Sequence, residues 1–227
     1  MVFVDDLAAP ELPPAEAHHL VNVLRLRSDE VVIASDGAGG WMRCHLKGVG
    51  PGVTLVADDE PRAEARPEPT ITIAFALAKG DRPEWVAQKL TELGVDRIVP
   101  LHTTRSVVRW QGERGARAVE RLRRVTREAA AQCRRTWLPE VTTVLDLDAL
   151  ADWAGSPPLL AHPGGNSLVM GDRVVAVGPE GGWDEAELAR WDDRVGLGPT
   201  VLRSETAAVA AGAVLCAVRS GVVGELA

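Results

Sequence analysis

The sequence of 227 residues has no tyrosine and only two phenylalanines, against seven tryptophans. We interpret this imbalance as compositional drift and not as a platform for stacking bases. No apolar stretch approaches the roughly 18 residues that cross a bilayer. The longest stretch, AAVAAGAVLCAV at residues 207–218, is too short and rich in alanine. The opening residues MVFVDD are acidic where a signal peptide is positively charged, so we expect a cytoplasmic protein with no membrane partner.

Cysteine is also scarce, and its placement excludes two classes of protein. Cys44, Cys133 and Cys216 are far apart in the sequence and contain no CxxC pair. They are typical of reduced thiols and exclude a disulfide framework or a cysteine zinc site. The five histidines have no metal-ligand spacing, so no metal is expected. Neither phosphate-binding pattern, GxxxxGK[ST] or GxGxxG, occurs.

Positive charge is scarce overall, with a net charge of −7, but it is concentrated in one segment. Residues 105–135 hold ten arginines and three glutamates, a local balance of +7. Such clustering marks a candidate surface for binding phosphate. The alternative is a solvated amphipathic helix with many ion pairs. Three local carboxylates cannot pair ten guanidinium groups, although acidic residues distant in sequence could still cover them.

The composition divides the chain into two predicted domains. Residues 58–69, DDEPRAEARPEP, combine charge with three prolines and have almost no apolar side chain, which is typical of a linker. We therefore predict a domain over residues 1–68 and a second over residues 70–227. The first contains a helical pattern at 16–26 and short β-type runs at 31–35, 41–46 and 53–57, which predict a small β-barrel-like module.

The second domain alternates between strand and helix patterns. Apolar runs predict strands at 70–77, 95–101, 158–162, 174–177 and 194–198. Helical spacing predicts helices at 83–93, closed by Gly94, at 118–133 and at 207–218. This alternation favours a parallel sheet covered by helices, with ligands at the carboxyl ends of its strands.

Three segments that follow predicted strands resemble ligand-binding loops: LLAHPGG at 159–165, VGPEGG at 177–182 and GLGPTVLRSETA at 196–207. Glycine lets a backbone approach a ligand closely, and proline stiffens a turn. Asp184 and Glu187 fit a capping box, so a helix should begin directly after the second loop. From this loop alone, a ligand site and a plain tight connection are equally good interpretations.

Five motifs in order resemble one family almost from end to end. AHHLVNVLRLRSDEVV is similar to an N-terminal signature, and AKGDRPEWVAQKLTELGVDRIVPLHTTRSVV to the start of a catalytic domain. EAAAQCRRTWLPEV, VGPEGG and LGPTVLRSETA match three further blocks. The chain thereby resembles the bacterial 16S rRNA uridine-N3 methyltransferases of the SPOUT superfamily. The resemblance implies a PUA-like RNA-binding domain followed by an α/β domain with a trefoil knot, a homodimer, and S-adenosylmethionine (SAM) as cofactor.

The resemblance also implies site residues. The SAM loops would be 160–164, 178–182 and 197–206. Carried over by position, the residues that bind SAM are Leu160, His162, Gly164, Gly178, Pro179, Glu180, Gly181, Leu197, Gly198, Leu202 and Thr206. Glu180 would either accept backbone N–H bonds or face the sulfonium charge.

Methylation of uridine N3 needs an exposed base, loss of the N3 proton and attack on the sulfonium methyl group. Glu205 is the candidate base, although a role at the start of a helix explains it equally well. Arg203 and Arg105 are candidates to stabilise the charge that develops on the uracil oxygen. The RNA-binding candidates are His19, Arg25, Arg27, Lys79, Lys89 and Arg135, together with the arginines of 117–124.

Two other functions remain open at this point. A SPOUT enzyme that methylates the ribose 2′-OH would share the three loops, but it is not expected to carry the HHLVNVLRL and ELGV blocks in this order. A non-catalytic RNA-binding assembly factor for the small ribosomal subunit would keep the basic segment but would not need intact SAM loops.

Overall fold

The computed structural model describes residues 1–13, 16–17, 20, 25–48, 52–169 and 174–223. The chain forms two compact units, one of Met1–Arg66 with Ala130–Leu138, the other of Pro67–Ala129 with Pro139–Ala227. The division after Arg66 falls within the predicted linker. Residues 130–138 join the first unit, which no feature of the sequence suggested. The predicted helix at 16–26 lies largely outside the described residues.

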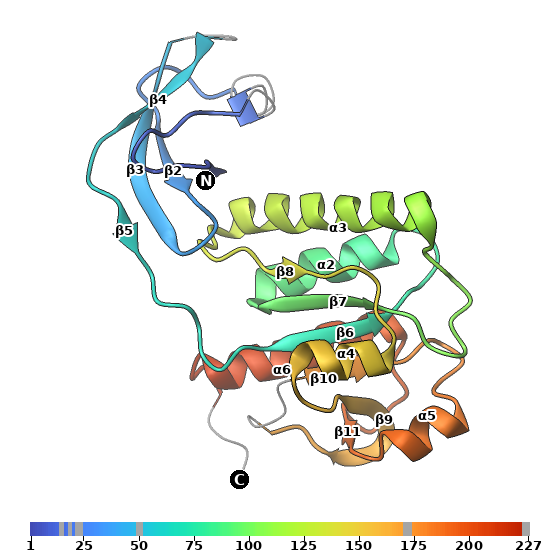
Figure 1. Cartoon of the computed structure of the whole chain (residues 1–227). Coiled ribbons are helices and arrows are strands. Elements are labelled where there is room, and N and C mark those ends of the chain that lie inside the picture. Colours follow the sequence, from blue (N-terminus) through green and yellow to red (C-terminus); the bar gives the residue numbers. More distant parts are fainter. Residues whose placement is uncertain (14–15, 18–19, 21–24, 49–51, 170–173, 224–227) are drawn as a thin grey trace. The chain divides into compact units, whose positions relative to one another are not determined.

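The first unit is built around a five-stranded mixed sheet in the order β1-β2-β3-β4, with β5 also paired to β3 (Figure 1). Its strands are β1 (Val2–Phe3), β2 (Val31–Ser35), β3 (Gly40–Lys47), β4 (Thr54–Ala57) and β5 (Arg62–Ala63). Strands β2 and β3 pair antiparallel and are joined by a hairpin turn at residues 36–39. Alternate residues of β2 and β3, such as Ala34, Met42 and Cys44, point into one apolar cluster.

The second unit contains a six-stranded sheet in the order β11-β9-β10-β6-β7-β8. Its strands are β6 (Thr72–Ala76), β7 (Arg97–Leu101), β8 (Glu140–Val141), β9 (Leu159–Ser167), β10 (Val174–Val177) and β11 (Arg194–Gly196). Every neighbouring pair is parallel, which confirms the predicted sheet. The trefoil knot stays a prediction.

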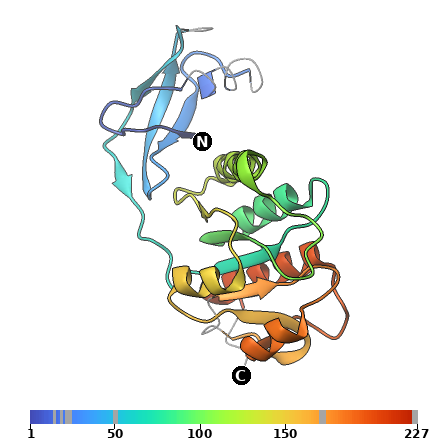
Figure 2. The ribbon, with the colours of Figure 1, turned by 45° about the vertical axis from the view of Figure 1, so that its right-hand side comes forward.

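Helices cover both faces of this sheet (Figure 2). They are α2 (Arg82–Leu93), α3 (Gly112–Cys133), α4 (Leu147–Ala154), α5 (Glu185–Arg190) and α6 (Ser204–Arg219). Ile73 and Phe75 of β6 point toward α2, α3 and α6, whereas Ala74 points toward α4. Strand residues are therefore apolar on both faces, as a sheet buried between two helical layers requires. The sequence patterns had not predicted α4.

Local signals fix the ends of these helices. Gly94 closes α2 in the left-handed region at φ 100°, where its N–H donates to the carbonyls of Leu90 and Thr91. Asp184 and Glu187 form the predicted capping box at the start of α5. Over the part of the chain that the structure describes, no helix is long and apolar enough to cross a membrane, and no cluster of side chains fits a metal ion.

Candidate active site

The three predicted loops meet at the edge of the sheet formed by β9, β10 and β11. The first differs from its prediction, because β9 continues through residues 162–165 to Ser167 and is not interrupted by a loop. Its pairing with β11 is irregular instead: Arg194 lies opposite Leu160, but the next residue, Val195, lies opposite Asn166. The residues between these two pairings therefore leave the regular ladder and become available to line a site.

The second segment is a tight turn packed around one tryptophan. Gly178 follows β10 directly, and Gly182 N–H donates to the Pro179 carbonyl over 2.9 Å. The buried Trp183 donates its indole N–H to the Ala161 carbonyl of β9 over 2.9 Å. A Cβ atom on Gly178 would lie 3.0 Å from the Trp183 ring. Glycine at 178 thus permits the ring to pack against the turn. The packing of Trp183 explains this glycine without reference to a ligand.

The third segment leads from β11 into α6. Gly198 adopts φ +130°, a conformation that residues with side chains rarely adopt, and a Cβ there would meet open space. Leu197 and Leu202 are partly buried against the core. The Ser204 hydroxyl donates to the Gly178 carbonyl over 2.8 Å, which ties the first turn of α6 to the second segment.

Together these segments enclose a cavity of about 460 Å³. Its wall is largely apolar and carries a few polar groups, as is common in cofactor sites. The lining residues are Arg105, Ala161, His162, Pro163, Val177, Gly178, Pro179, Glu180, Gly182, Trp183, Glu185, Leu188, Leu197, Gly198, Thr200, Val201, Leu202, Ser204 and Ala207.

Of the predicted cofactor residues, the cavity wall includes His162, Gly178, Pro179, Glu180, Leu197, Gly198 and Leu202. Four others lie off this wall. Leu160 is fully buried in the core on the α4 side of the sheet, and Gly164 is exposed on β9. Gly181 faces the Arg105 side chain, and Thr206 is exposed on α6.

Sequence reasoning missed several wall residues, of which Trp183 is the most substantial. The sequence did offer one indication, a tryptophan directly after a glycine-rich turn, because glycine has no side chain and leaves room for an aromatic ring to pack on the turn. Val201 and Ser204 were also missed, although both lie inside the third predicted segment.

The three catalytic candidates occupy different positions. Arg105 lines the cavity and donates to the Gly181 carbonyl over 3.2 Å, with its other nitrogen 3.6 Å from the Asp184 carboxylate. Arg203 is exposed at the N-cap of α6. Glu205 lies in the first turn of α6, 14% exposed, and lines a small side pocket with Arg82 instead of the main cavity.

Glu180 was expected either to accept backbone N–H bonds or to face the sulfonium group. Its carboxylate accepts a hydrogen bond from the Arg82 guanidinium over 2.7 Å. Arg82 stands at the start of α2, far from this motif in sequence, so no local pattern predicted the pair.

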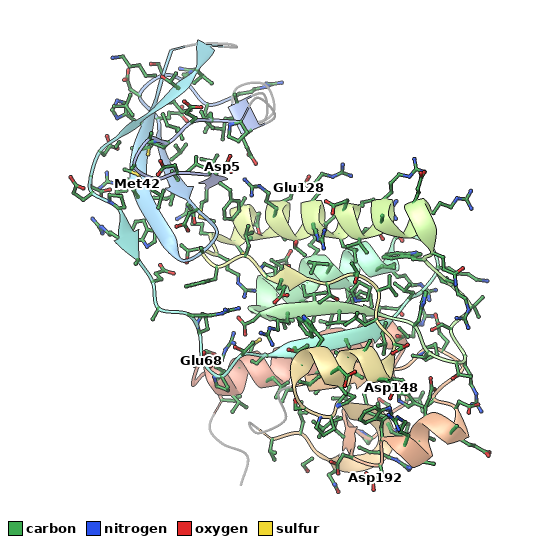
Figure 3. The ribbon with its side chains drawn as sticks, in the orientation of Figure 1. Asp5, Met42, Glu68, Glu128, Asp148 and Asp192 are labelled. Carbon is green, nitrogen blue, oxygen red and sulfur yellow. The ribbon has the colours of Figure 1, made fainter. Side chains whose placement is uncertain are left out.

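Most arginines of the basic helix α3 have carboxylate partners. Arg117, Arg123 and Arg124 pair with Glu113, Glu120 and Glu128 on the same helix. Arg121 pairs with Glu84 of α2, a partner distant in sequence that the local count of charges did not include. Figure 3 shows Glu128 on the side of α3 that faces away from the sheet. These pairs favour a solvated, ion-paired face over an array of free cations for these four arginines.

The remaining RNA-binding candidates are divided between the two units. Lys79 is exposed after β6, and Lys89 is held by both oxygens of Glu92 at 2.9 Å. Arg25 and Arg27 are exposed in the first unit, to which the half-buried Arg135 also belongs. His19 lies outside the described residues.

A second cavity, of about 650 Å³, lies beside the end of β7. His102 lines it and accepts a hydrogen bond from the Trp110 backbone N–H over 3.1 Å. Burial, aided by the Arg109 charge and opposed by Asp146, lowers the pKa of His102 below its ordinary value of 6.5.

Two family models match the chain. The model of an RNA methyltransferase domain matches residues 66–216, and the model of an RNA methyltransferase PUA domain matches residues 12–52. Among curated relatives, the ribosomal RNA small subunit methyltransferase E of Mycobacterium bovis is 36% identical, with 88% of this chain and 83% of the relative covered. The protein of the same name from Bacillus subtilis is 33% identical, with 85% and 83% covered.

Solved structures agree with these relatives. A Legionella pneumophila protein described as a methyltransferase, in complex with the bound cofactor SAM, has a TM-score of 0.83 and 30% identity, with 95% of this chain and 96% of that chain covered. A ribosomal RNA small subunit methyltransferase E from Neisseria gonorrhoeae, bound to SAM, has a TM-score of 0.81 and 27% identity, with 94% of each chain covered. The chain belongs to the ribosomal RNA small subunit methyltransferase E family, whose members join a PUA domain to an RNA methyltransferase domain.

Proposed function

We propose that this chain transfers the methyl group of SAM to N3 of a uridine in the 16S RNA of the small ribosomal subunit. The observation that carries the proposal is the cavity at β9, β10 and β11, which unites the three segments that the sequence marked as SAM loops. Its volume of about 460 Å³ lies in the range of small-molecule sites. The relatives of known structure that bind SAM share this fold over nearly the whole chain.

The residues of the cavity suit SAM by their chemistry. Leu197, Leu202 and Trp183 offer apolar surface to an adenosine, and the turn at Gly178 brings backbone groups to the wall. Glu180 places a carboxylate at the same wall, where a cationic ligand is favoured. SAM supplies the methyl group and its leaving group, so the chain has to bind, orient and exclude water.

For the charge that develops on the uracil, Arg105 is the better placed of the two arginine candidates, because it lines the cavity. Arg203 is exposed at the start of α6 and remains a second candidate. Glu205 is proposed as proton acceptor with a specific test. Glu205→Gln should abolish turnover at saturating SAM if Glu205 is the base; unchanged turnover would remove it from that role.

RNA contact is proposed for Lys79, for Arg25 and Arg27, and for Arg135. Each true phosphate contact that is removed should reduce the slope of log affinity against log salt concentration by about 1. Arg117→Met tests the arginines of 117–124 in the same way, and an unchanged slope would assign them to a solvated face. We further propose a homodimer with a trefoil-knotted second unit, acting in the cytoplasm where its ribosomal substrate is assembled.

The test of the reaction uses purified protein, methyl-labelled SAM and unmodified small ribosomal subunits, with deproteinised rRNA in parallel. Digestion of the RNA and mass spectrometry of its nucleosides should give 3-methyluridine, and the comparison of the two samples shows whether the assembled subunit is needed. A labelled ribose methyl group would instead establish 2′-O methylation. No transfer to either RNA, together with no binding of SAM, would overturn the methyltransferase proposal and leave the non-catalytic assembly factor as the alternative.

A further inference from the structure

One arginine joins two carboxylates from different parts of the site. Arg82, at the start of α2, lies with Nη1 2.7 Å from Glu180 Oε1 and with Nε 3.6 Å from Glu205 Oε1. Glu180 follows β10 and lines the main cavity, whereas Glu205 follows the third segment and lines the side pocket. Arg82 itself lines the side pocket, so its guanidinium stands between the two.

The two carboxylates differ in how well they are satisfied. Glu180 is 52% exposed, so water can solvate it when a partner leaves. Glu205 is 14% exposed, and its Oε2 is buried without a hydrogen-bond partner among the described residues. The side pocket around it is lined mainly by apolar residues, among them Phe75, Pro83 and Val86. A buried carboxylate oxygen in such surroundings is costly unless a donor reaches it. Oε2 of Glu205 can therefore still accept a hydrogen bond from the Arg82 guanidinium.

The charge of the cofactor changes during methyl transfer. SAM carries a sulfonium cation, and its product S-adenosylhomocysteine (SAH) is a neutral thioether, so the two ligands differ by one positive charge close to the reacting centre. A carboxylate at the cavity wall attracts the first and not the second. An arginine that already neutralises that carboxylate competes with SAM but not with SAH.

We infer that Arg82 sets the discrimination between SAM and SAH by exchanging between Glu180 and Glu205. When a cation enters the cavity, the Arg82 guanidinium breaks its ion pair with Glu180 and forms one with the unpartnered Oε2 of Glu205. When the neutral product remains, Arg82 returns to Glu180 and the preference of the cavity for a cationic ligand falls. This inference rests on the proposed function, because it needs SAM in the cavity.

Calorimetric dissociation constants for SAM and for SAH, measured without RNA, test the exchange. Arg82→Met frees Glu180, so the ratio of the SAH constant to the SAM constant should rise roughly five-fold, the effect of one close charge contact across water. Glu205→Gln weakens the second position of Arg82, so the ratio should fall. In the Arg82→Met background the Glu205→Gln change should no longer affect the ratio.

Arg117→Met removes the same charge from an exposed pair on α3 and should leave the ratio unchanged. If Arg82→Met weakens SAM and SAH by the same factor, or changes neither, Arg82 only supports the fold and the inference is overturned. An effect of Glu205→Gln that persists without Arg82 also overturns it. Failure of the unaltered protein to bind SAM would overturn the proposed function, a result distinct from normal SAM binding with an unchanged ratio.

Discussion

Replacing Arg219 by methionine should destabilise the second unit strongly. Arg219 ends α6, and its side chain is 10% exposed. It donates to the carbonyls of Gly94 and Pro69 over 2.6 and 3.1 Å and forms an ion pair with Asp96. Asp96 is only 4% exposed and also accepts the Ile71 backbone N–H over 2.9 Å. One side chain therefore joins the end of α6, the end of α2 and the segments that enter β6 and β7.

The size of the effect follows from what the substitution leaves behind. Methionine fills much of the space of the arginine stem, so little packing is lost. The Asp96 carboxylate would remain buried without its cation, and two carbonyls would lose their donor. Removing one partner of a buried ion pair costs about 3–5 kcal/mol. For a unit of this size that corresponds to a fall of roughly 6–20 °C in melting temperature.

Urea unfolding followed by tryptophan fluorescence, with thermal scans in parallel, measures this loss. The exposed pair of Arg117 and Glu113 provides the control, because Arg117→Met should cost less than about 1 kcal/mol. The double variant Asp96→Asn/Arg219→Met should be more stable than Arg219→Met alone, since the uncompensated charge is gone. A loss below about 1 kcal/mol for Arg219→Met, or strict additivity in the double variant, would refute the reasoning.

Three further predictions concern other parts of the chain. Because the pKa of His102 is lowered in the folded state, the unfolded chain takes up a proton more readily. The contribution of His102 to the free energy of unfolding should be fully present above pH 6.5 and should be lost as the pH falls below it. His102→Gln should flatten this decline when unfolding is measured as a function of pH. Of the three thiols, the exposed Cys133 should react fast with a thiol reagent at pH 8 and Cys44 slowly, since burial and then the nearby Asp58 raise the pKa of Cys44; equal rates would contradict this. Gly165→Ala should cost about 1–3 kcal/mol in urea unfolding, because the new Cβ would lie 2.6 Å from the Val195 carbonyl carbon. Gly52→Ala should be neutral, because its new Cβ would have no atom of the described residues within 4 Å.

The sequence predicted those features whose cause is local. Alternating apolar runs and helical spacing gave the long helices of the second unit and its strands except the two-residue β8, and the capping box at Asp184 placed the start of α5 correctly. Gly94 was recognised as the end of α2 because the left-handed conformation there favours glycine. The short helix α4 was missed, although Asp146 caps it, because its eight residues are too few to establish a helical period in the sequence.

The site was predicted less completely, since its contacts join residues distant in sequence. The motif at 177–182 predicted a ligand loop, but only the packed structure shows that Trp183 fills the space above Gly178. The count of charges in 105–135 left Arg121 without a partner, because its partner Glu84 comes from α2. The strand β9 continues where a loop was expected, since β11 pairs with it beyond a break in register.

By itself the sequence determined the family, most strands and helices of the second unit and the three segments of the cavity, because patterning, capping and glycine-rich turns act over a few residues. Only the tertiary structure decided which charges neutralise one another. Arg82 meets Glu180 and Glu205, and Arg219 meets Asp96, across separations of about a hundred residues or more. Coulomb energy depends on distance in space and on burial, and both are set by how the helices pack on the sheet.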